Sequence, residues 1–478
     1  MPRLFPLKGL TRGGARPRWR GPAALFTSMT ALAATSLAAG PSNAVPPTTP
    51  CALKRSDAHH SEGLDTWNAA YPRPDRRLDA VMIFLSFPDS VPRTTPIELT
   101  ADHFPATSRF FERASYGKFT LRPHPLREWL PMPRASTAYA MQRDWNSARR
   151  SAYLRDALAA SDPRVDFSRY DVVYFVADPD APGVNSDATK VVNLEAPLRA
   201  DGTDIRRVVT VFEQHPPDRL VLAHETGHVF DLPDLYHRPT DDKGDWDTYV
   251  GDWDLMGSQF GLAPDLFGWH KWKLGWLEPR QVSCVQAAGG GGTRMTLEPL
   301  GAGGPAMAEA AGAAGGAAGA EAFEAEVRGR RLGGGRGFPS GGLGSGGLGS
   351  GGLGSSELGS GGLGFGLGGG TKLAVVRTGR DSVIAFEARG PVGNDGAVCS
   401  QGVLVYRVRS ETVSGGGPVE VLDAHPDTAA CWEDSVYPPL ADAPVGLGES
   451  FTVPGEDVRL EVEDRTASGA WTVTISTG

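Results

Sequence analysis

Two histidines four residues apart, His224 and His228, constrain the fold of this 478-residue chain more than any other feature. Residues four apart on an α-helix lie on one face, so a helix here lets both imidazoles reach one Zn²⁺ ion. Glu225 follows the first histidine, where it can act as general base toward a metal-bound water. The segment 220–230 also carries apolar residues on one helical face, which argues against two ordinary surface histidines.

A zinc site of this kind needs a third protein ligand, because catalytic zinc usually has three such ligands and one open position. Pro233 ends the helix just after His228, so the chain can turn back toward the metal. This position favours Asp234 as the third ligand. Asp231 and His237 are the rival candidates, and a ligand elsewhere in the chain is the remaining alternative.

A second cluster, Trp253–Ser258, contains Met256 at a distance from His224 that suits a methionine-containing turn beneath the metal. A methionine in a turn is more often ordinary core filling, so the cluster would be weak evidence alone. Together with the two histidines and an aspartate on a bent-back chain it becomes specific.

The N-terminus predicts export. Residues 1–44 combine a basic stretch, an apolar segment from Pro22 to Gly40 and small residues ending at Ala44, which is the pattern of a cleaved signal peptide. A transmembrane anchor is the alternative, but the segment is rich in Ser and Thr and marginal in length. We therefore expect a secreted, extracellular protein without stable membrane insertion.

The charge balance argues against nucleic acid as the main partner. The chain has 47 basic and 56 acidic residues, a formal charge of −9, and without the six basic residues of 1–44 the remainder carries −15. A nucleic-acid-binding protein needs a basic surface to neutralise phosphates. Proteins or peptides are the expected partners, and we expect a monomer.

Four cysteines in an exported chain indicate up to two disulfides, with three possible pairings. Cys399 and Cys431 share the C-terminal region, so we expect them to pair and Cys51 to join Cys284. The alternative role for Cys51 is a thiolate that masks a metal.

The alternation of strands and helices predicts an α/β or α+β catalytic domain at 78–286, of which we expect α+β, after a polar, proline-rich leader or linker at 45–77. Buried strands are expected at 78–87, 170–177 and 206–212, with a further strand at 115–121. Helices are expected at 101–115, 147–160 and 218–230.

Residues 287–478 read as a small β-rich domain. Its expected strands are 295–297, 372–377, 383–388 and 403–408, together with 458–462 paired with 471–475. A low-complexity insert at 301–370 holds 29 of the 62 glycines and predicts a disordered loop, because it cannot bury enough side chain to offset its ordering entropy. The strands on either side of it are expected to pair.

Several segments together resemble the immune inhibitor A-type secreted bacterial metallopeptidases, which are relatives of the metzincins. The resemblance covers residues 78–280 and extends weakly to the strand 402–408, and it is carried by Phe110–Gly117, His224–His228, Leu232–Tyr236, Trp253–Gly257 and Trp272–Leu277. It implies a metzincin-like fold and a zinc endopeptidase.

The resemblance also implies a ligand set of His224, His228 and Asp234 with Glu225 as base. Two features depart from the family pattern. Asp231 stands where the family has Gly, at a sharp turn where Asp is tolerated at a cost, and the stretch before residue 78 is too short for a large prodomain.

In the implied reaction, Glu225 takes a proton from the zinc-activated water and returns it to the leaving amine. The strand 206–212 is the expected edge for an extended substrate. No oxyanion donor is assigned; Tyr249 and His270 are candidates. No calcium site is assigned, and a structural Ca²⁺ ion stays an open expectation.

Two other functions are compatible with the same residues. A secreted binding module could hold a structural or inactive zinc site, although such a site needs no base and normally closes with a fourth protein ligand. A zinc amidase that acts on cell-wall peptides would use the same ligands and the same glutamate.

Overall fold

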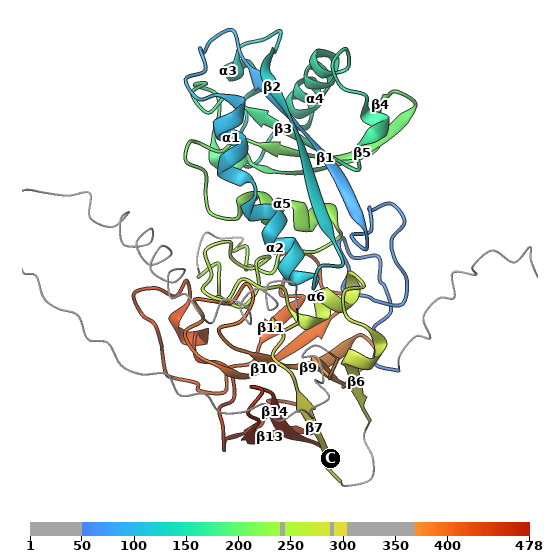
Figure 1. Cartoon of the computed structure of the whole chain (residues 1–478), viewed down its shortest axis with the longest axis vertical. Helices are drawn as coiled ribbons and strands as arrows, with labels where there is room; N and C mark the ends of the chain where they lie inside the picture. The colour runs from blue at the N-terminus through green and yellow to red at the C-terminus, as the bar shows by residue number, and fades with distance from the viewer. Residues whose placement is uncertain (1–49, 240–243, 287–290, 304–368) are drawn as a thin grey trace, which may run out of the picture. The chain divides into compact units, whose positions relative to one another are not determined.

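A five-stranded sheet organises the first half of the chain (Figure 1). The computed structural model describes residues 50–239, 244–286, 291–303 and 369–478. The sheet has the order β2-β1-β3-β5-β4 and consists of β1 (Arg77–Ser86), β2 (Thr120–Pro131), β3 (Val172–Ala177), β4 (Lys190–Ala200) and β5 (Thr203–Val211). Four of these strands run parallel, whereas β4 pairs antiparallel with β5.

The three strands predicted at 78–87, 170–177 and 206–212 are confirmed as β1, β3 and β5. The expectation that 206–212 is an edge is wrong, because β5 lies between β3 and β4. Strand β4 is the edge on this side of the sheet, and β2 is the other edge. The residues of β4 are mostly exposed or partly exposed and carry no continuous apolar run that would mark the strand in the sequence.

Alternate residues of β1 enter two different cores, because successive side chains of a strand point to opposite faces. Leu78, Ala80, Met82 and Phe84 belong to one core, which also holds buried residues of the helices α1, α2 and α5. Val81, Ile83 and Leu85 belong to the other, with residues of α4. Burial on both faces explains why β1 is continuously apolar.

The helices are α1 (Pro96–His103), α2 (Ala106–Ala114), α3 (Ser136–Tyr139), α4 (Ser147–Ser161), α5 (Val221–Val229) and α6 (Gly268–Lys273). The helix predicted at 147–160 is confirmed as α4, and that at 218–230 is the shorter α5. The single helix predicted at 101–115 is wrong. It is divided into α1 and α2 at Pro105, which has no backbone N–H to continue the ladder.

The predicted strand at 115–121 begins only at Thr120, because Tyr116 and Gly117 adopt positive φ values of 58° and 78° and form a turn. The remaining short helical turns are η1 (Phe167–Arg169), η2 (Ser186–Ala188), η3 (Pro279–Gln281) and η4 (Pro438–Leu440).

Two further sheets follow in the second half of the chain. One has the order β11-β10-β9-β8-β6 and contains β6 (Val282–Val285), β8 (Leu373–Arg377), β9 (Ser382–Arg389), β10 (Gly402–Arg409) and β11 (Val419–Val421). The other has the order β12-β13-β14-β7 and contains β7 (Thr293–Leu297), β12 (Ser450–Thr452), β13 (Val458–Arg465) and β14 (Trp471–Thr477). The predicted pairing of 458–462 with 471–475 is confirmed as β13 and β14.

The strands that flank the glycine-rich insert do not pair with each other, contrary to our expectation. Strand β7 pairs with β14, whereas β8 pairs with β6 and β9 in the other sheet. The segments that flank the insert are nevertheless in contact, because the backbone N–H of Glu298 donates to the carbonyl of Thr371 at 2.8 Å.

Both predicted disulfides are present, Cys51–Cys284 and Cys399–Cys431. The alternative in which Cys51 is a thiolate is therefore wrong. The first disulfide attaches the segment 50–76, predicted as a leader or linker, to β6. Several residues of this segment are buried, including Leu53 in the first core and His60, Ser61 and Glu62.

Some expectations lie outside the described residues: the signal peptide at 1–44 and most of the insert, residues 304–368. Among the residues that the structure describes, no helix is both long and apolar enough to cross a membrane. The domain boundary expected between residues 286 and 287 stays a prediction, and β6, which precedes it, pairs with β8 beyond it.

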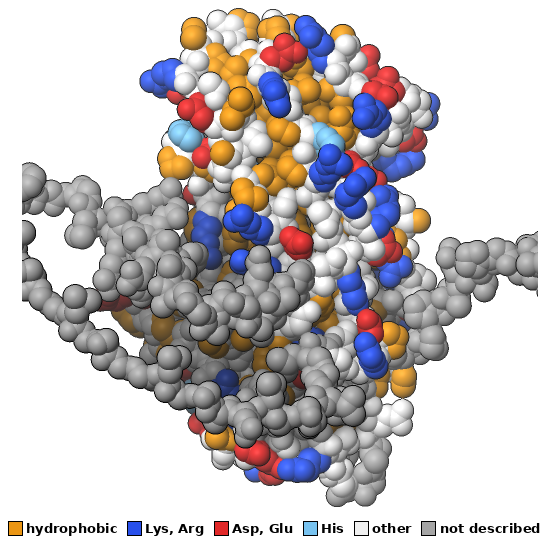
Figure 2. All heavy atoms as spheres, viewed as in Figure 1, with side chains coloured by type: hydrophobic (Ala, Val, Ile, Leu, Met, Phe, Trp, Pro, Cys, Tyr) orange, Lys and Arg blue, Asp and Glu red, His pale blue; other side chains and the backbone are white. Residues whose placement is uncertain are grey.

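Figure 2 shows Lys and Arg side chains along the right-hand edge of the view, with Asp and Glu among them. Charges of opposite sign are also paired beside the first sheet: Arg76 and Asp171, which directly precede β1 and β3, form a 2.9 Å contact. His124 likewise lies 2.7 Å from Asp79. Charges of both signs are therefore mixed on this part of the surface.

Replacing residues 304–368 by a loop of about six Gly and Ser residues should leave the chain folded, since Glu298 and Thr371 hold the two ends together. The sequence predicts that the insert is a disordered loop, and each halving of such a loop lowers its closure cost by about 0.6 kcal/mol. Shortening it to about six residues should therefore increase the free energy of unfolding by about 2 kcal/mol. Urea denaturation measures this change. A shortened protein much less stable than the full chain would show that the insert packs against the fold.

Candidate metal centre

The helix α5 is buried along its whole length, from Val221 to Val229. Leu222, Ala223 and Val229 pack into the first core, which holds the helix against the central sheet. The hydroxyl of Tyr174 on β3 makes a 2.8 Å hydrogen bond to Thr226. The helix is therefore a firmly packed support for the side chains that it carries.

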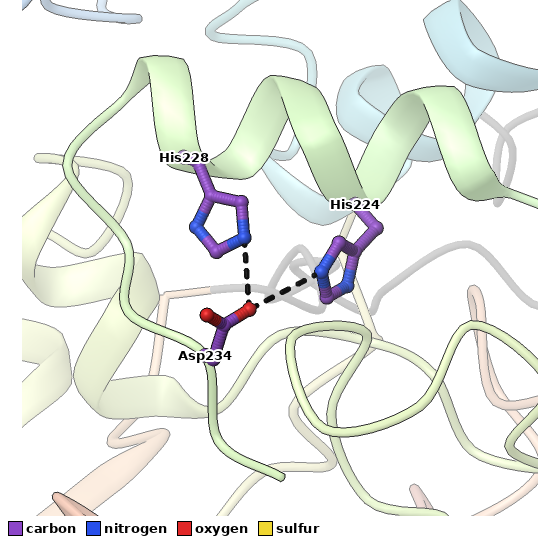
Figure 3. Close-up of side chains that lie close together, drawn as sticks. All are labelled: His224, His228 and Asp234. Atoms are coloured by element: carbon purple, nitrogen blue, oxygen red, sulfur yellow. Dashed lines mark ion pairs between the residues drawn. The ribbon is translucent and has the colours of Figure 1, made fainter. Parts of the chain in front are cut away.

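The chain turns sharply where α5 ends. The backbone N–H of Leu232 bonds to the carbonyl of Gly227 at 3.1 Å, and Asp231 takes a positive φ of 66°. This left-handed residue reverses the chain, and Asp234 returns beneath the helix (Figure 3). The chain returns toward the histidines as expected, but the helix ends at Val229 and the turn is made at Asp231 rather than at Pro233.

His224, His228 and Asp234 come together at this turn, with one donor atom of each within 4.8 Å of the others. The Nε2 atom of His228 lies 2.9 Å from Oδ1 of Asp234, and that of His224 lies 3.5 Å from the same oxygen. Figure 3 shows both imidazoles, from one face of α5, directed at the carboxylate below them.

The outward ring nitrogens decide which atoms face the centre. Nδ1 of His224 lies 2.9 Å from the carbonyl of Leu255, and Nδ1 of His228 lies 2.8 Å from that of Leu232. A carbonyl only accepts hydrogen bonds, so each Nδ1 carries a proton, and whenever the ring is neutral its Nε2 lone pair faces inward.

With both rings neutral, the two Nε2 atoms and the Asp234 carboxylate oxygen are all hydrogen-bond acceptors. Such a group of acceptors needs a cation, either a proton or a metal ion, at its centre. Oδ1 of Asp234 is buried and accepts no hydrogen bond of good geometry. Burial disfavours a charge on His228, but the Asp234 carboxylate outweighs burial and raises the pKa of His228 to about 9. Burial similarly opposes the charge of Asp234, yet His228 and His224 hold the pKa of Asp234 well below its usual range. In the absence of a metal a proton fills this role, and two imidazoles with a carboxylate also suit a transition-metal ion.

Glu225 lies on the same helix at the wall of the cleft. Its Oε2 accepts a 2.9 Å hydrogen bond from the backbone N–H of Val191 on β4. Burial raises the pKa of Glu225, although His224 and His228 offset part of this effect. A carboxylate with a raised pKa that is fixed beside a metal-type cluster is suited to proton transfer.

The predicted methionine turn lies beneath the cluster. A Cβ atom added to Gly227 would fall 2.4 Å from Sδ of Met256, so the helix and the turn are in direct contact here. The turn is held by Asp254, whose Oδ1 accepts the N–H of Met256 at 2.8 Å. It also supplies the Leu255 carbonyl that orients His224.

An open cleft of about 550 Å³ contains the three clustered residues and Glu225. Strand β4 contributes Lys190, Val191 and Asn193 to its lining. Side chains from other parts of the fold complete the walls, among them Arg143, Glu213, Tyr236, Trp246 and Ser414. The cluster is therefore accessible to a ligand that enters beside the edge strand.

The two rival third ligands lie elsewhere. Nδ1 of His237 contacts the Tyr249 hydroxyl at 3.2 Å, and the carboxylate of Asp231 contacts His60 and Arg55. Neither belongs to the metal-type cluster found among the described residues. Of the candidates considered, Asp234 alone is brought to the two histidines.

Neither candidate for an oxyanion donor lines the cleft as described. The Tyr249 hydroxyl faces His237, and His270 is fully buried between Glu62 and Asp254, at 2.8 and 3.1 Å. Tyr236 does line it, with its ring stacked on His224 at a centroid separation of 6.4 Å. The sequence signal that could have identified Tyr236 is its position two residues after Asp234.

Ser414 was also missed, because it lies 180 residues from Asp234, which it contacts. Its Oγ accepts the backbone N–H of Asp234 at 2.8 Å and lies 3.2 Å from Oδ2 of the same residue. The neighbouring Gly415 N–H donates to the Asp234 carbonyl at 2.9 Å. No local sequence pattern marks such a contact.

Comparisons with protein-family models and with curated protein sequences found no match to this chain.

Asp234→Ala should lower the affinity for a divalent metal by more than the 10- to 100-fold that loss of a supporting residue typically costs, since it removes about a third of the donor set. His237→Ala should leave the affinity unchanged, because its ring contacts Tyr249 instead. Competition titration with Zn²⁺ and a chromophoric chelator measures both. The reverse ranking would move the third ligand to His237.

Burial disfavours protonation of His270, but Glu62 and Asp254 outweigh burial and raise the pKa of His270 to about 9. A raised pKa stabilises the fold fully below the unfolded value of about 6.5 and less as the pH rises through about 9. The difference in unfolding free energy between the native protein and His270→Gln should therefore shrink from pH 6.5 to pH 9. Urea denaturation over this range measures it, and a constant difference would contradict the protonated His270.

Proposed function

We propose that this protein is a secreted zinc-dependent endopeptidase with a metzincin-like catalytic domain. The observation that carries the proposal is the cluster of His224, His228 and Asp234 beside Glu225 in an open cleft. The two disulfides are compatible with an oxidising compartment, as expected for secretion.

The donor set fits zinc. Two imidazoles and one carboxylate are ligands that Zn²⁺ prefers, and three protein ligands leave a position for water or substrate. When bound, zinc would lower the pKa of a water molecule to about 7 and polarise the scissile carbonyl. The three inward lone pairs, with outward nitrogens fixed by backbone carbonyls, support this assignment.

Glu225 acts as the general base and then as the general acid. Its carboxylate takes the proton of the attacking water and delivers it to the leaving amine. The hydrogen bond from Val191 fixes its orientation, and the raised pKa brings it closer to that of the groups with which it exchanges protons.

The substrate binds along β4 rather than β5. Strand β4 is one of the two edges of the central sheet, and three of its residues line the cleft. An extended peptide can add to such an edge through main-chain hydrogen bonds. Because Val191 both belongs to this edge and bonds to Glu225, the bound peptide lies beside the base.

A secreted binding module with a structural zinc site is the less favoured function. A structural site normally closes with a fourth protein ligand, whereas the cluster found among the described residues contains three. The buried glutamate at its wall would also have no role there. An amidase acting on cell-wall peptides uses the same chemistry, and a peptide substrate panel separates it from an endopeptidase.

Glu225→Gln should bind zinc like the native protein, because all three ligands remain, but should lose casein hydrolysis by about 10²- to 10⁴-fold. Glu213→Gln is the matched control: Glu213 is also buried and lines the same cleft, but it lies outside α5. It should keep most of the activity. Chelator-sensitive cleavage measured with a fluorescent casein is the readout.

Full activity in a zinc-loaded Glu225→Gln variant would disprove the role of Glu225. Absence of chelator-sensitive hydrolysis in the native, zinc-loaded protein would disprove the peptidase function itself.

A further inference from the structure

Asp231 lies in the turn between His228 and Asp234, three positions from each of these clustered residues. It is fully buried, and its φ of 66° lies in the left-handed region. A non-glycine residue pays a conformational cost there, although Asp tolerates it better than most. A buried carboxylate adds a second cost unless it is paired. Asp231 therefore needs specific partners to be retained at this turn.

Those partners come from the segment 50–76, more than 150 residues earlier in the chain. Nδ1 of His60 lies 2.9 Å from Oδ1 of Asp231, and Nη2 of Arg55 lies 2.5 Å from Oδ2. In addition, the backbone carbonyl of Asp231 accepts a 2.7 Å hydrogen bond from Nζ of Lys273 on α6. All three oxygens of the residue are held by groups from other parts of the fold.

The segment that supplies Arg55 and His60 is itself fixed at several points. The disulfide Cys51–Cys284 attaches it to β6, and the hydroxyl of Ser61 donates to the carbonyl of Ser410 at 2.7 Å. The segment also folds back on itself, because the N–H of Leu64 bonds to the carbonyl of Leu53 at 2.8 Å. Arg55 and His60 are thus presented by an anchored support.

A second contact links this support to the cluster. The ring of His60 is stacked on that of His228, with an interplanar angle of 24° and centroids 5.6 Å apart. His60 therefore touches one clustered residue directly and holds the turn that delivers the other, Asp234. Arg55 acts on the turn through the same carboxylate.

We propose that Arg55 and His60 are positioning residues for the zinc site, acting through Asp231. They fix the left-handed turn, and the turn sets the positions of His228 and Asp234 around the metal. The segment 50–76 is then a working part of the enzyme rather than a removable leader. The inference rests on the proposed zinc site and adds residues that support it.

Three variants test this role: Arg55→Met, Asp231→Asn and Asp231→Gly. Each removes the ion pair, and each should lower zinc affinity by about 10- to 100-fold, as loss of a residue that orients metal ligands does. Arg55→Met combined with Asp231→Asn should lose little more than either change alone, because both remove the same contact. Zinc affinity is measured on the full chain by competition with a chromophoric chelator.

Asp231→Gly distinguishes two roles of Arg55 and His60: positioning the turn, or only neutralising the buried charge of Asp231. Glycine adopts a positive φ without strain and leaves no unpaired carboxylate, so this variant should fold even if the other two do not. Arg55 is 18% exposed and can then reach water. Native zinc affinity in Asp231→Gly would overturn the proposal, because Arg55 and His60 would then only neutralise Asp231.

Lys271→Met is the control for a general loss of stability. Lys271 is fully buried and pairs with Asp265 at 2.7 Å, so its removal also breaks a buried ion pair. It should lower the melting temperature but leave zinc affinity unchanged. If Arg55→Met behaved in the same way, the positioning role would be disproved.

This test of the positioning role does not depend on the proposed peptidase function, because zinc affinity is measured without substrate. A native protein that binds zinc tightly but cleaves no peptide would disprove the proposed activity and leave the positioning role intact. Unchanged affinity in Arg55→Met and Asp231→Gly, with normal hydrolysis in the native protein, would disprove the positioning role alone.

Discussion

The arrangement around the cleft depends on the contacts that the buried carboxylate of Asp231 makes with Arg55 and His60. A buried charge must be paired, and its partners are drawn from the anchored N-terminal segment and from α6. Asp231 thereby joins the end of α5 to elements that lie far away in sequence. The turn at this residue places Asp234 beneath the two histidines, so the cluster depends on tertiary contacts as well as on the helix.

The residues of the site that the sequence predicted are those related by short spacing. His224 and His228 follow from helical periodicity. Asp234 was predicted because Pro233 was expected to end the helix, although α5 ends at Val229 and the chain reverses at Asp231. The strands β1 and β3 were equally predictable, because burial on both faces produces an uninterrupted apolar run. For the two histidines and the two strands, neighbouring residues contain the physical cause. The position of Asp234 also depends on the contacts that Asp231 makes with residues far away in sequence.

Features set by long-range pairing could not be predicted in the same way. The edge strand β4 is partly exposed and has no distinctive pattern, and the strands on either side of the insert join different sheets. Ser414 reaches Asp234 across 180 residues. The division of the helix predicted at 101–115 into α1 and α2 is different, because Pro105 is a local signal for it. We gave more weight to the apolar residues around Pro105 than to the proline itself.

A second buried network shows why these long-range contacts matter for the site. Glu62 of the N-terminal segment contacts His270, and His270 contacts Asp254, which holds the methionine turn. That turn supplies the carbonyl that orients His224, while the turn at Asp231 supplies the one that orients His228. The same short segment therefore supports both histidines by separate routes. A side chain that is to hold a metal must be fixed in orientation, and the contacts that fix the two histidines run from residues 55–62 as well as from the helix that carries them.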